Sequence, residues 1–191
     1  MSNKIILLVI LLGFFNLTNG QETTKKVELN IKLSSSVLIK GTSTLHDWES
    51  IVEKTSSELV VNNLEDANIE TLNVKVQVLS IKSGKSIMDK LTYKALKADE
   101  HPTITFIFKK GEIVKEDARF MDIKLIGDLS IAGVTKNVSV ITKINKSGKT
   151  IILKGVHKLK MTDFGISPPK ALLGTIKTGD EITIEFNLIF E

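Results

Sequence analysis

The chain has 191 residues, a net charge of +4 and no cysteine. This length suits one domain with an adequate core, and the lack of cysteine excludes disulfides, thiol chemistry and Cys-based metal sites. The lysines occur in separate pairs without interleaved aromatic residues, which favours a solvated surface over a nucleic-acid or anionic-lipid patch.

The first twenty residues are predicted to be a secretory signal peptide. Lys4 is followed by an apolar run of 11 residues, Ile5–Phe15, and Thr18 and Gly20 lie at positions −3 and −1 of a cut before Gln21. The apolar run is too short to cross a bilayer comfortably, although an uncleaved anchor remains the alternative. We therefore expect cleavage near Gly20/Gln21, a periplasmic or extracellular location, and no stable membrane span afterwards.

Alternating apolar and polar residues predict strands through most of the remaining chain. The apolar rows lie in Val27–Leu33, Val37–Gly41, Leu72–Val78, Ile104–Phe108, Met121–Ile131, Ile151–Met161 and Ile182–Phe190. Asp163–Lys177, with two prolines and two glycines, is predicted to be a loop over one end. About eight strands at this spacing indicate a closed antiparallel barrel or a sandwich, and the strand pattern alone favours the barrel only slightly.

The hydrophobic period changes within Ser86–Phe108. Apolar residues recur every three or four positions from Ile87 to Ala98, which predicts a short helix that ends at Asp99–Pro102. We expect this helix to cover the barrel mouth, with Leu91 and Ala95 facing the lumen. The amphipathic ring of Tyr93 suits the rim, with its hydroxyl toward the polar end of a ligand. The alternative is that the helix only plugs the barrel.

The sequence shows no catalytic constellation. His46, His101 and His157 have no metal-ligand spacing, and no serine lies in a nucleophile elbow. A non-enzymatic protein is therefore expected, with no metal site, although a site built from His46 and Asp47 remains an alternative. His157 lies on an apolar row, where it either satisfies its nitrogens locally or donates a hydrogen bond to a polar ligand head.

Three motifs carry a resemblance to a known family. The segment Met88–Phe106 reads M-D-K-x-x-Y-x-A-L-K-A-x-x-H-P-x-I-T-F, Gly127–Lys136 reads G-x-L-x-I-x-G-V-T-K, and the pieces Asp163–Ile166 and Gly179–Ile182 read D-F-G-I and G-D-E-I. In this order they closely resemble the YceI-like polyisoprenoid-binding family, over nearly the whole mature chain.

The resemblance implies an all-β fold, an eight-stranded antiparallel lipocalin-like β-barrel over residues 21–191, with a short helix and a loop at its mouth. It further implies a non-enzymatic protein that holds a polyisoprenoid, a quinone or another long apolar lipid in the lumen, without any other cofactor. A homodimer is left open, and no nucleic-acid partner is expected. The alternative is a filled barrel that acts as a structural or interaction protein of the cell envelope or stress response.

The inward rows and the resemblance together give the candidate ligand-binding residues. They are Val74, Val76, Leu91, Tyr93, Ile104, Phe106, Phe108, Met121, Ile123, Leu125, His157, Leu159, Met161, Phe164, Ile184 and Phe186. Whether these side chains fill the lumen or line a hollow one cannot be decided from their spacing.

Overall fold

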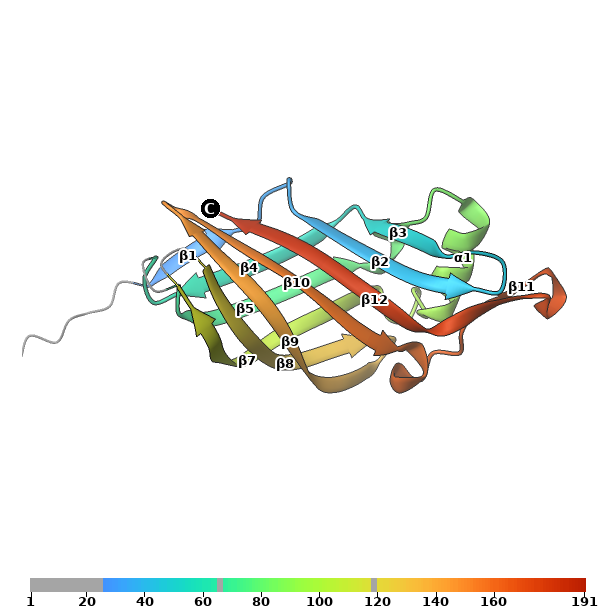
Figure 1. The fold of residues 1–191 in the computed structure, drawn as a ribbon. Helices are drawn as coiled ribbons and strands as arrows, with labels where there is room; N and C mark the ends of the chain where they lie inside the picture. The colour runs from blue at the N-terminus through green and yellow to red at the C-terminus, as the bar shows by residue number, and fades with distance from the viewer. Residues whose placement is uncertain (1–25, 65–66, 118–119) are drawn as a thin grey trace, which may run out of the picture.

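The computed structural model describes residues 26–64, 67–117 and 120–191. These residues form one strongly curled antiparallel sheet with a single α-helix at one end (Figure 1). The predicted signal peptide lies outside the described residues.

The elements are β1 (Val27–Asn30), β2 (Ser36–Ser43), β3 (Trp48–Val52), β4 (Thr55–Val61), β5 (Ile69–Gln77), η1 (Val78–Ser80), β6 (Ile81–Lys82), α1 (Ser86–Ala95), β7 (Thr103–Glu116), β8 (Phe120–Ile131), β9 (Val134–Ser147), β10 (Thr150–Lys160), η2 (Met161–Phe164), β11 (Lys170–Ala171), η3 (Leu172–Gly174) and β12 (Ile176–Phe190). The all-β antiparallel fold with one short helix confirms that part of the prediction.

The predicted count of eight strands is not confirmed, because the described residues form a 12-stranded sheet. Its order is β1-β4-β5-β7-β8-β9-β10-β12-β2-β3-β6, with β11 paired to β12. The count is higher because predicted rows are interrupted. A turn separates β1 from β2, and the 3₁₀-helix η1 separates β5 from β6.

The end of the sheet opposite α1 is tied together by its two terminal strands. β1 pairs with β4, while Ile31, just after β1, forms a bridge to Phe190 at the end of β12. The backbones of Asn30 and Glu191 exchange two hydrogen bonds of 3.1 Å. Figure 1 shows β1 and the C-terminus together at this end and α1 and β11 at the other.

Burial follows the pleat of the strands. In β8, every second residue from Met121 to Ile131 is buried, and the residues between them are only half-buried. The buried residues form two clusters. The packed floor, as we call the first, includes Leu29, Leu59, Met121, Ile123, Ile144, Ile151, Leu153, Leu188 and Phe190. The second, near α1, comprises Leu129, Ile131, Ala132, Leu159, Met161, Phe164 and Ile166.

Helix α1 ends three residues earlier than predicted. Lys97 has a left-handed φ of 52°. Its N–H donates to the Lys94 carbonyl at 3.2 Å, and the Ala98 N–H donates to the Tyr93 carbonyl at 2.9 Å. These two bonds form a Schellman motif, which satisfies carbonyls at the helix end. The helix is therefore terminated by its own last turn, before the chain reaches Pro102.

Candidate ligand-binding cavities

The curled sheet encloses two apolar cavities of about 140 Å³ and about 400 Å³. Ile39, Ile104 and Ile184 line both, so the two cavities adjoin along the lumen. An apolar cavity of about 150 Å³ is enough to hold benzene, and ligand pockets in proteins start at about 300 Å³. The lumen is therefore hollow over part of its length.

The smaller cavity lies between the packed floor and the larger cavity. Side chains from β2, β3, β5, β7–β10 and β12 surround it, and all but one are apolar. Its lining is Val37, Ile39, Val52, Leu72, Val74, Val76, Ile104, Phe106, Leu125, Leu129, Val138, Val140, Leu153, His157, Ile184, Phe186 and Leu188.

The larger cavity lies under α1. It is bounded by the inner side of the helix, by the loop between β2 and β3, and by the segment that contains β11. The helix contributes Leu91 and Ala95, as expected, together with Ile87 and Met88. The polar groups on this lining, which include Lys85 and Lys170, come from the segments at the open end. A ligand with an apolar tail and a polar head fits this distribution when its tail points inward.

Glycines explain why the aromatic side chains leave the lumen open. A Cβ on Gly155 would lie 2.4 Å from Cζ of Phe186, and a Cβ on Gly127 would lie 2.6 Å from Cζ of Phe106. The tip of each ring thus occupies the space that a side chain would take at a glycine of a neighbouring strand. The Trp48 ring lies over Gly41 in the same way, with 2.4 Å from the built Cβ to Cζ2. The missing side chains are a condition for the hollow interior.

The structure brings most of the predicted ligand-binding residues to the cavities. Val74, Val76, Phe106, Leu125, His157 and Phe186 line the smaller cavity, Leu91, Leu159 and Met161 the larger, and Ile104 and Ile184 both. Tyr93, Phe108, Met121, Ile123 and Phe164 line neither. Met121 and Ile123 are part of the packed floor, Phe108 packs against it, and Phe164 is buried in the second cluster.

Tyr93 differs from the expected arrangement. Its hydroxyl accepts a hydrogen bond from Lys82 Nζ at 2.7 Å and lies 3.0 Å from the carbonyl oxygens of both Leu79 and Ile81. These bonds hold α1 against the chain between β5 and β6, so the hydroxyl is not directed at a ligand in the lumen.

Asp89 anchors the start of the same helix. Its carboxylate accepts hydrogen bonds from the Ser83 backbone N–H at 2.8 Å and the Ser83 hydroxyl at 2.7 Å. Burial acts to raise the pKa of Asp89, but the two bonds from Ser83 and the charge of Lys82 outweigh it and lower the pKa below its usual value. The helix is thus fixed to the sheet at two points.

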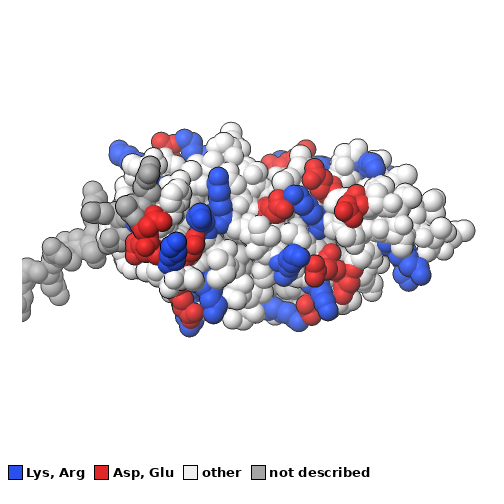
Figure 2. Space-filling model, in the orientation of Figure 1, with Lys and Arg blue, Asp and Glu red and all other residues white. Residues whose placement is uncertain are grey.

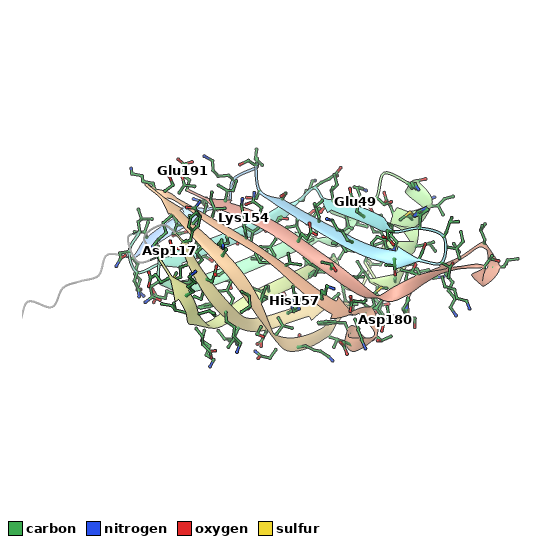
Figure 3. All side chains as sticks on the ribbon, in the orientation of Figure 1. Glu49, Asp117, Lys154, His157, Asp180 and Glu191 are labelled. Atoms are coloured by element: carbon green, nitrogen blue, oxygen red, sulfur yellow. The ribbon has the colours of Figure 1, made fainter. Side chains whose placement is uncertain are left out.

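His157 is the one ionisable side chain on the smaller cavity. It is half-buried on β10 opposite Ile184 of β12, and Figure 3 shows it near the middle of the barrel, away from Asp117 and Glu191. Burial lowers the pKa of the imidazole below 6.5, because an apolar surrounding disfavours the charged form. The cavity wall is therefore uncharged at neutral pH.

The alternative site at His46 and Asp47 lacks the side-chain pair that it requires. His46 Nδ1 lies 2.7 Å from the backbone oxygen of Asp47, not from its carboxylate. The Ser43 hydroxyl organises this loop through the backbones of Leu45 and His46. Among the described residues there is no group of three or more His, Cys, Asp or Glu side chains that could hold a metal ion. None of the helices in this part of the chain is long and apolar enough to cross a membrane.

Several lining residues were not among the sequence candidates. Val37 and Ile39 belong to a predicted strand, and their period-two row could have placed them inside. The residues at the open end carry no such signal, since they lie in loops or at element ends. This group includes Leu45, Trp48, Pro169 and Leu172.

Comparison with known proteins gives the family. Residues 34–190 match the YceI-like domain, so the chain belongs to the YceI-like family. No curated protein matches the sequence.

Three solved structures share the fold at low sequence identity. BcnA of Burkholderia cenocepacia superposes with a TM-score of 0.70 at 19% identity, covering 83% of this chain and 98% of BcnA. A polyisoprenoid-binding domain from Saccharophagus degradans has a TM-score of 0.67 at 12% identity, covering 87% and 99%. The YceI protein of Campylobacter jejuni has a TM-score of 0.60 at 23% identity, covering 72% and 81%.

Proposed function

We propose that this protein binds a long apolar lipid, a polyisoprenoid or the tail of a quinone, in its lumen. The observation that carries the proposal is the pair of adjoining apolar cavities, which together lead from the α1 end of the sheet down to the packed floor. Their presence speaks against a filled barrel with a purely structural role.

The strand pairing supports a closed barrel around this ligand. β1 pairs with β4 and β2 pairs with β3. In the same way, β4 pairs with β5 and β3 pairs with β6. We interpret β1–β2, β3–β4 and β5–β6 as three interrupted strands. With β7, β8, β9, β10 and β12 they make eight, and the pairing of β12 with β2 joins the last to the first. Closure pairs most strand edges along the lumen, with β1 and β6 at the two ends of the strand order.

The chemistry of the lining suits a hydrocarbon chain. Each buried CH₂ group contributes about 0.8 kcal/mol, so one isoprene unit contributes roughly 3–4 kcal/mol before the entropic costs of binding. No charged group has to be neutralised deep in the lumen, because His157 is neutral there. The Saccharophagus degradans neighbour, a polyisoprenoid-binding domain, supports an isoprenoid as the natural choice.

We also propose that the protein is non-enzymatic and exported. The cavities hold no set of groups that resembles a catalytic constellation, and the first twenty residues have the pattern of a signal peptide. Cell fractionation, with the intact mass of the recovered protein, tests the second point. A mass that corresponds to Gln21–Glu191 in the exported fraction supports it, and a full-length chain retained inside the cell contradicts it.

Trp48, the single tryptophan, gives a direct test of lipid binding. Its ring lines the larger cavity, and its Nε1 donates a hydrogen bond to the Thr42 carbonyl at 3.0 Å. Titration with a long-chain prenyl alcohol should change its emission and saturate at one lipid per chain. Native mass spectrometry on the same samples should show the complex.

Two controls sharpen this experiment. The variant Trp48→Phe should lose the optical signal and keep the complex in the mass spectrum. A straight-chain alcohol of equal carbon number separates preference for isoprenoids from general lipid binding. Unchanged emission over the full titration, with only empty protein in the mass spectrum, would show that the lumen does not take up prenyl chains.

A further inference from the structure

Exposed apolar side chains surround the opening of the larger cavity. Leu45 in the β2–β3 loop is 66% exposed, Ile87 in the first turn of α1 is 73% exposed, and Leu172 after β11 is 72% exposed. All three also line the larger cavity, and Leu173, the next residue along, is fully exposed at 109%. We call these four side chains the apolar rim. Large apolar side chains gathered at one exposed place mark an interaction surface.

The two leucines of the rim also have an unfavourable backbone conformation. Leu172 has a φ of 48° and Leu173 a φ of 54°. A side chain with a Cβ atom is disfavoured in this left-handed region, where glycine is the usual residue. Both the backbone conformation of the two adjacent leucines and the exposure of their side chains lower the stability of the isolated protein. Such a cost is typical of a segment retained for function.

The rim is held as a unit by hydrogen bonds between two of its segments. The Thr44 N–H donates to the Lys177 carbonyl at 3.0 Å, and the Lys177 N–H donates to Thr44 Oγ1 at 3.2 Å. The loop that carries Leu45 is thereby fixed to the hairpin of β11 and β12 that carries Leu172.

The charge beside the rim is positive. The three segments that form it (residues 43–48, 83–88 and 167–177) contain three lysines, Lys85, Lys170 and Lys177, and one acidic residue, Asp47. These lysines are dispersed along the sequence, but Lys85 and Lys170 line the same cavity and Lys170 pairs with Lys177 across the hairpin. Figure 2 shows the end of the molecule at β11 as largely uncharged, with blue side chains below it, while red and blue alternate elsewhere.

We propose that the apolar rim docks on a lipid bilayer that contains anionic phospholipids. Leucine and isoleucine side chains enter the region between headgroups and acyl chains, and the neighbouring lysines meet the anionic headgroups. The mouth of the larger cavity then opens onto the membrane, so a lipid moves between bilayer and lumen without crossing water. This docking goes beyond the proposed lipid binding and rests on it only for the nature of the cargo.

Cosedimentation with vesicles tests the docking in the chain Gln21–Glu191. Vesicles of phosphatidylcholine with phosphatidylglycerol and no prenyl lipid should bind the protein, and vesicles of phosphatidylcholine alone should bind it much less. The double variant Leu172→Ser, Leu173→Ser should lose at least tenfold in vesicle affinity. The variants Lys170→Gln and Lys177→Gln should each lose about fivefold on the anionic vesicles only.

The matched control is Leu33→Ser. Leu33 is as exposed as Leu173, at 105%, and lies beside Lys32 at the other end of β2, so its replacement should leave vesicle binding unchanged. Equal binding by wild type and the rim variant would overturn the proposal. The proposal would also be overturned if sedimentation velocity showed dimers that form through the rim and the wild type did not bind vesicles.

A second readout separates docking from lipid binding itself. The single variant Leu173→Ser changes a rim residue that lines neither cavity. Wild type and Leu173→Ser should take up a prenyl alcohol dispersed in detergent equally well, measured by Trp48 emission, and the wild type should extract it from vesicles much faster than Leu173→Ser. Wild-type protein that binds vesicles and takes up no prenyl alcohol in either form would contradict the proposed function and leave the docking intact. Extraction by Leu173→Ser at the wild-type rate would contradict the docking.

Discussion

The glycines under the aromatic rings set the free space in the lumen. Because a Cβ on Gly155 would lie 2.4 Å from the Phe186 ring and 3.0 Å from the Ile141 carbonyl oxygen, the variant Gly155→Ala should push the ring into the smaller cavity. We expect about tenfold weaker prenyl binding, equivalent to roughly two displaced CH₂ groups. The free energy of unfolding should fall by about 1–3 kcal/mol, as for other overpacked cores.

Titration by Trp48 emission and urea denaturation measure these two effects. Val156→Ile adds one methylene to the next position of β10, whose side chain is exposed, and should change neither. The double variant Gly155→Ala, Phe186→Leu removes the clashing ring and should restore binding. If Gly155→Ala binds as tightly as wild type, the ring does not control the free space.

His157 should make stability depend on pH. In the folded protein, burial lowers the pKa of His157 below its usual value of 6.5. Below pH 6.5 the unfolded chain therefore binds a proton more readily than the folded chain does. The free energy of unfolding should therefore be fully retained above about pH 7 and should decrease as the pH falls toward 5.

Urea denaturation of wild type and His157→Leu at several pH values isolates this effect. The wild-type curve should fall more steeply than the variant curve between about pH 7 and 5, because the variant lacks the titrating group while all other groups are shared. Val156→Ile, a change at an exposed position of the same strand, should retain the wild-type slope. Identical slopes in wild type and His157→Leu would show that the imidazole does not resist protonation.

The end of α1 offers a prediction about a secondary-structure element. Lys97 occupies the left-handed position of the Schellman motif, with a φ of 52°, where glycine has no Cβ penalty. Lys97→Gly should raise the free energy of unfolding by roughly 1 kcal/mol. Lys94→Gly, within the helix, should lower it by roughly the same amount.

Thermal and urea denaturation of the two variants provide the comparison. Both lysines are exposed, so the loss of charge is common to the two variants and the difference reports the backbone conformation. Two variants that are destabilised alike would show that the left-handed position carries no strain.

The strands and the helix show which structural features can be predicted from local sequence patterns. Alternation correctly predicted long strands such as β8, since its buried face follows from the pleat. Proline was a sound indicator that the helix stops, but the stop lies at Lys97, because the hydrogen bonds of the last turn depend on backbone angles that residue types do not specify. The rim at Leu172 and Leu173 could not be predicted, because loops have no period and these leucines adopt a conformation that leucine disfavours.

At the level of the whole molecule, stability should be concentrated at the packed floor. Phe190 is fully buried there, and Phe186, four residues earlier on β12, lines the smaller cavity. Phe190→Ala should cost about 3–5 kcal/mol, the usual range for a buried ring. Phe186→Ala should cost clearly less, because its ring already faces empty space on one side.

Equilibrium urea denaturation of both variants measures this asymmetry. Ile144 is also fully buried in the packed floor, so the variant Ile144→Ala should be strongly destabilised as well. This variant shows whether the effect belongs to the floor or to Phe190 alone. Equal losses at Phe190 and Phe186 would mean that the interior is packed evenly along its length.

Whether the interior is hollow could not be inferred from the alternating rows. Met121 and Leu125 share the buried row of β8 and both belong to the packed floor, but only Leu125 also lines the smaller cavity. The difference between them arises from their height along the barrel and from glycines on other strands, such as Gly155 under Phe186. These are contacts between residues far apart in the sequence, which no local period records.

The packed floor gives the lumen a fixed depth. A prenyl chain bound as proposed should stop against Leu153 and Leu188, which lie both on the smaller cavity and in the floor. Every isoprene unit beyond that depth stays outside in water and forfeits roughly 3–4 kcal/mol of burial, and a chain that is too short leaves apolar wall unfilled. We therefore expect the lumen to select isoprenoids by their number of units rather than by a chemical group.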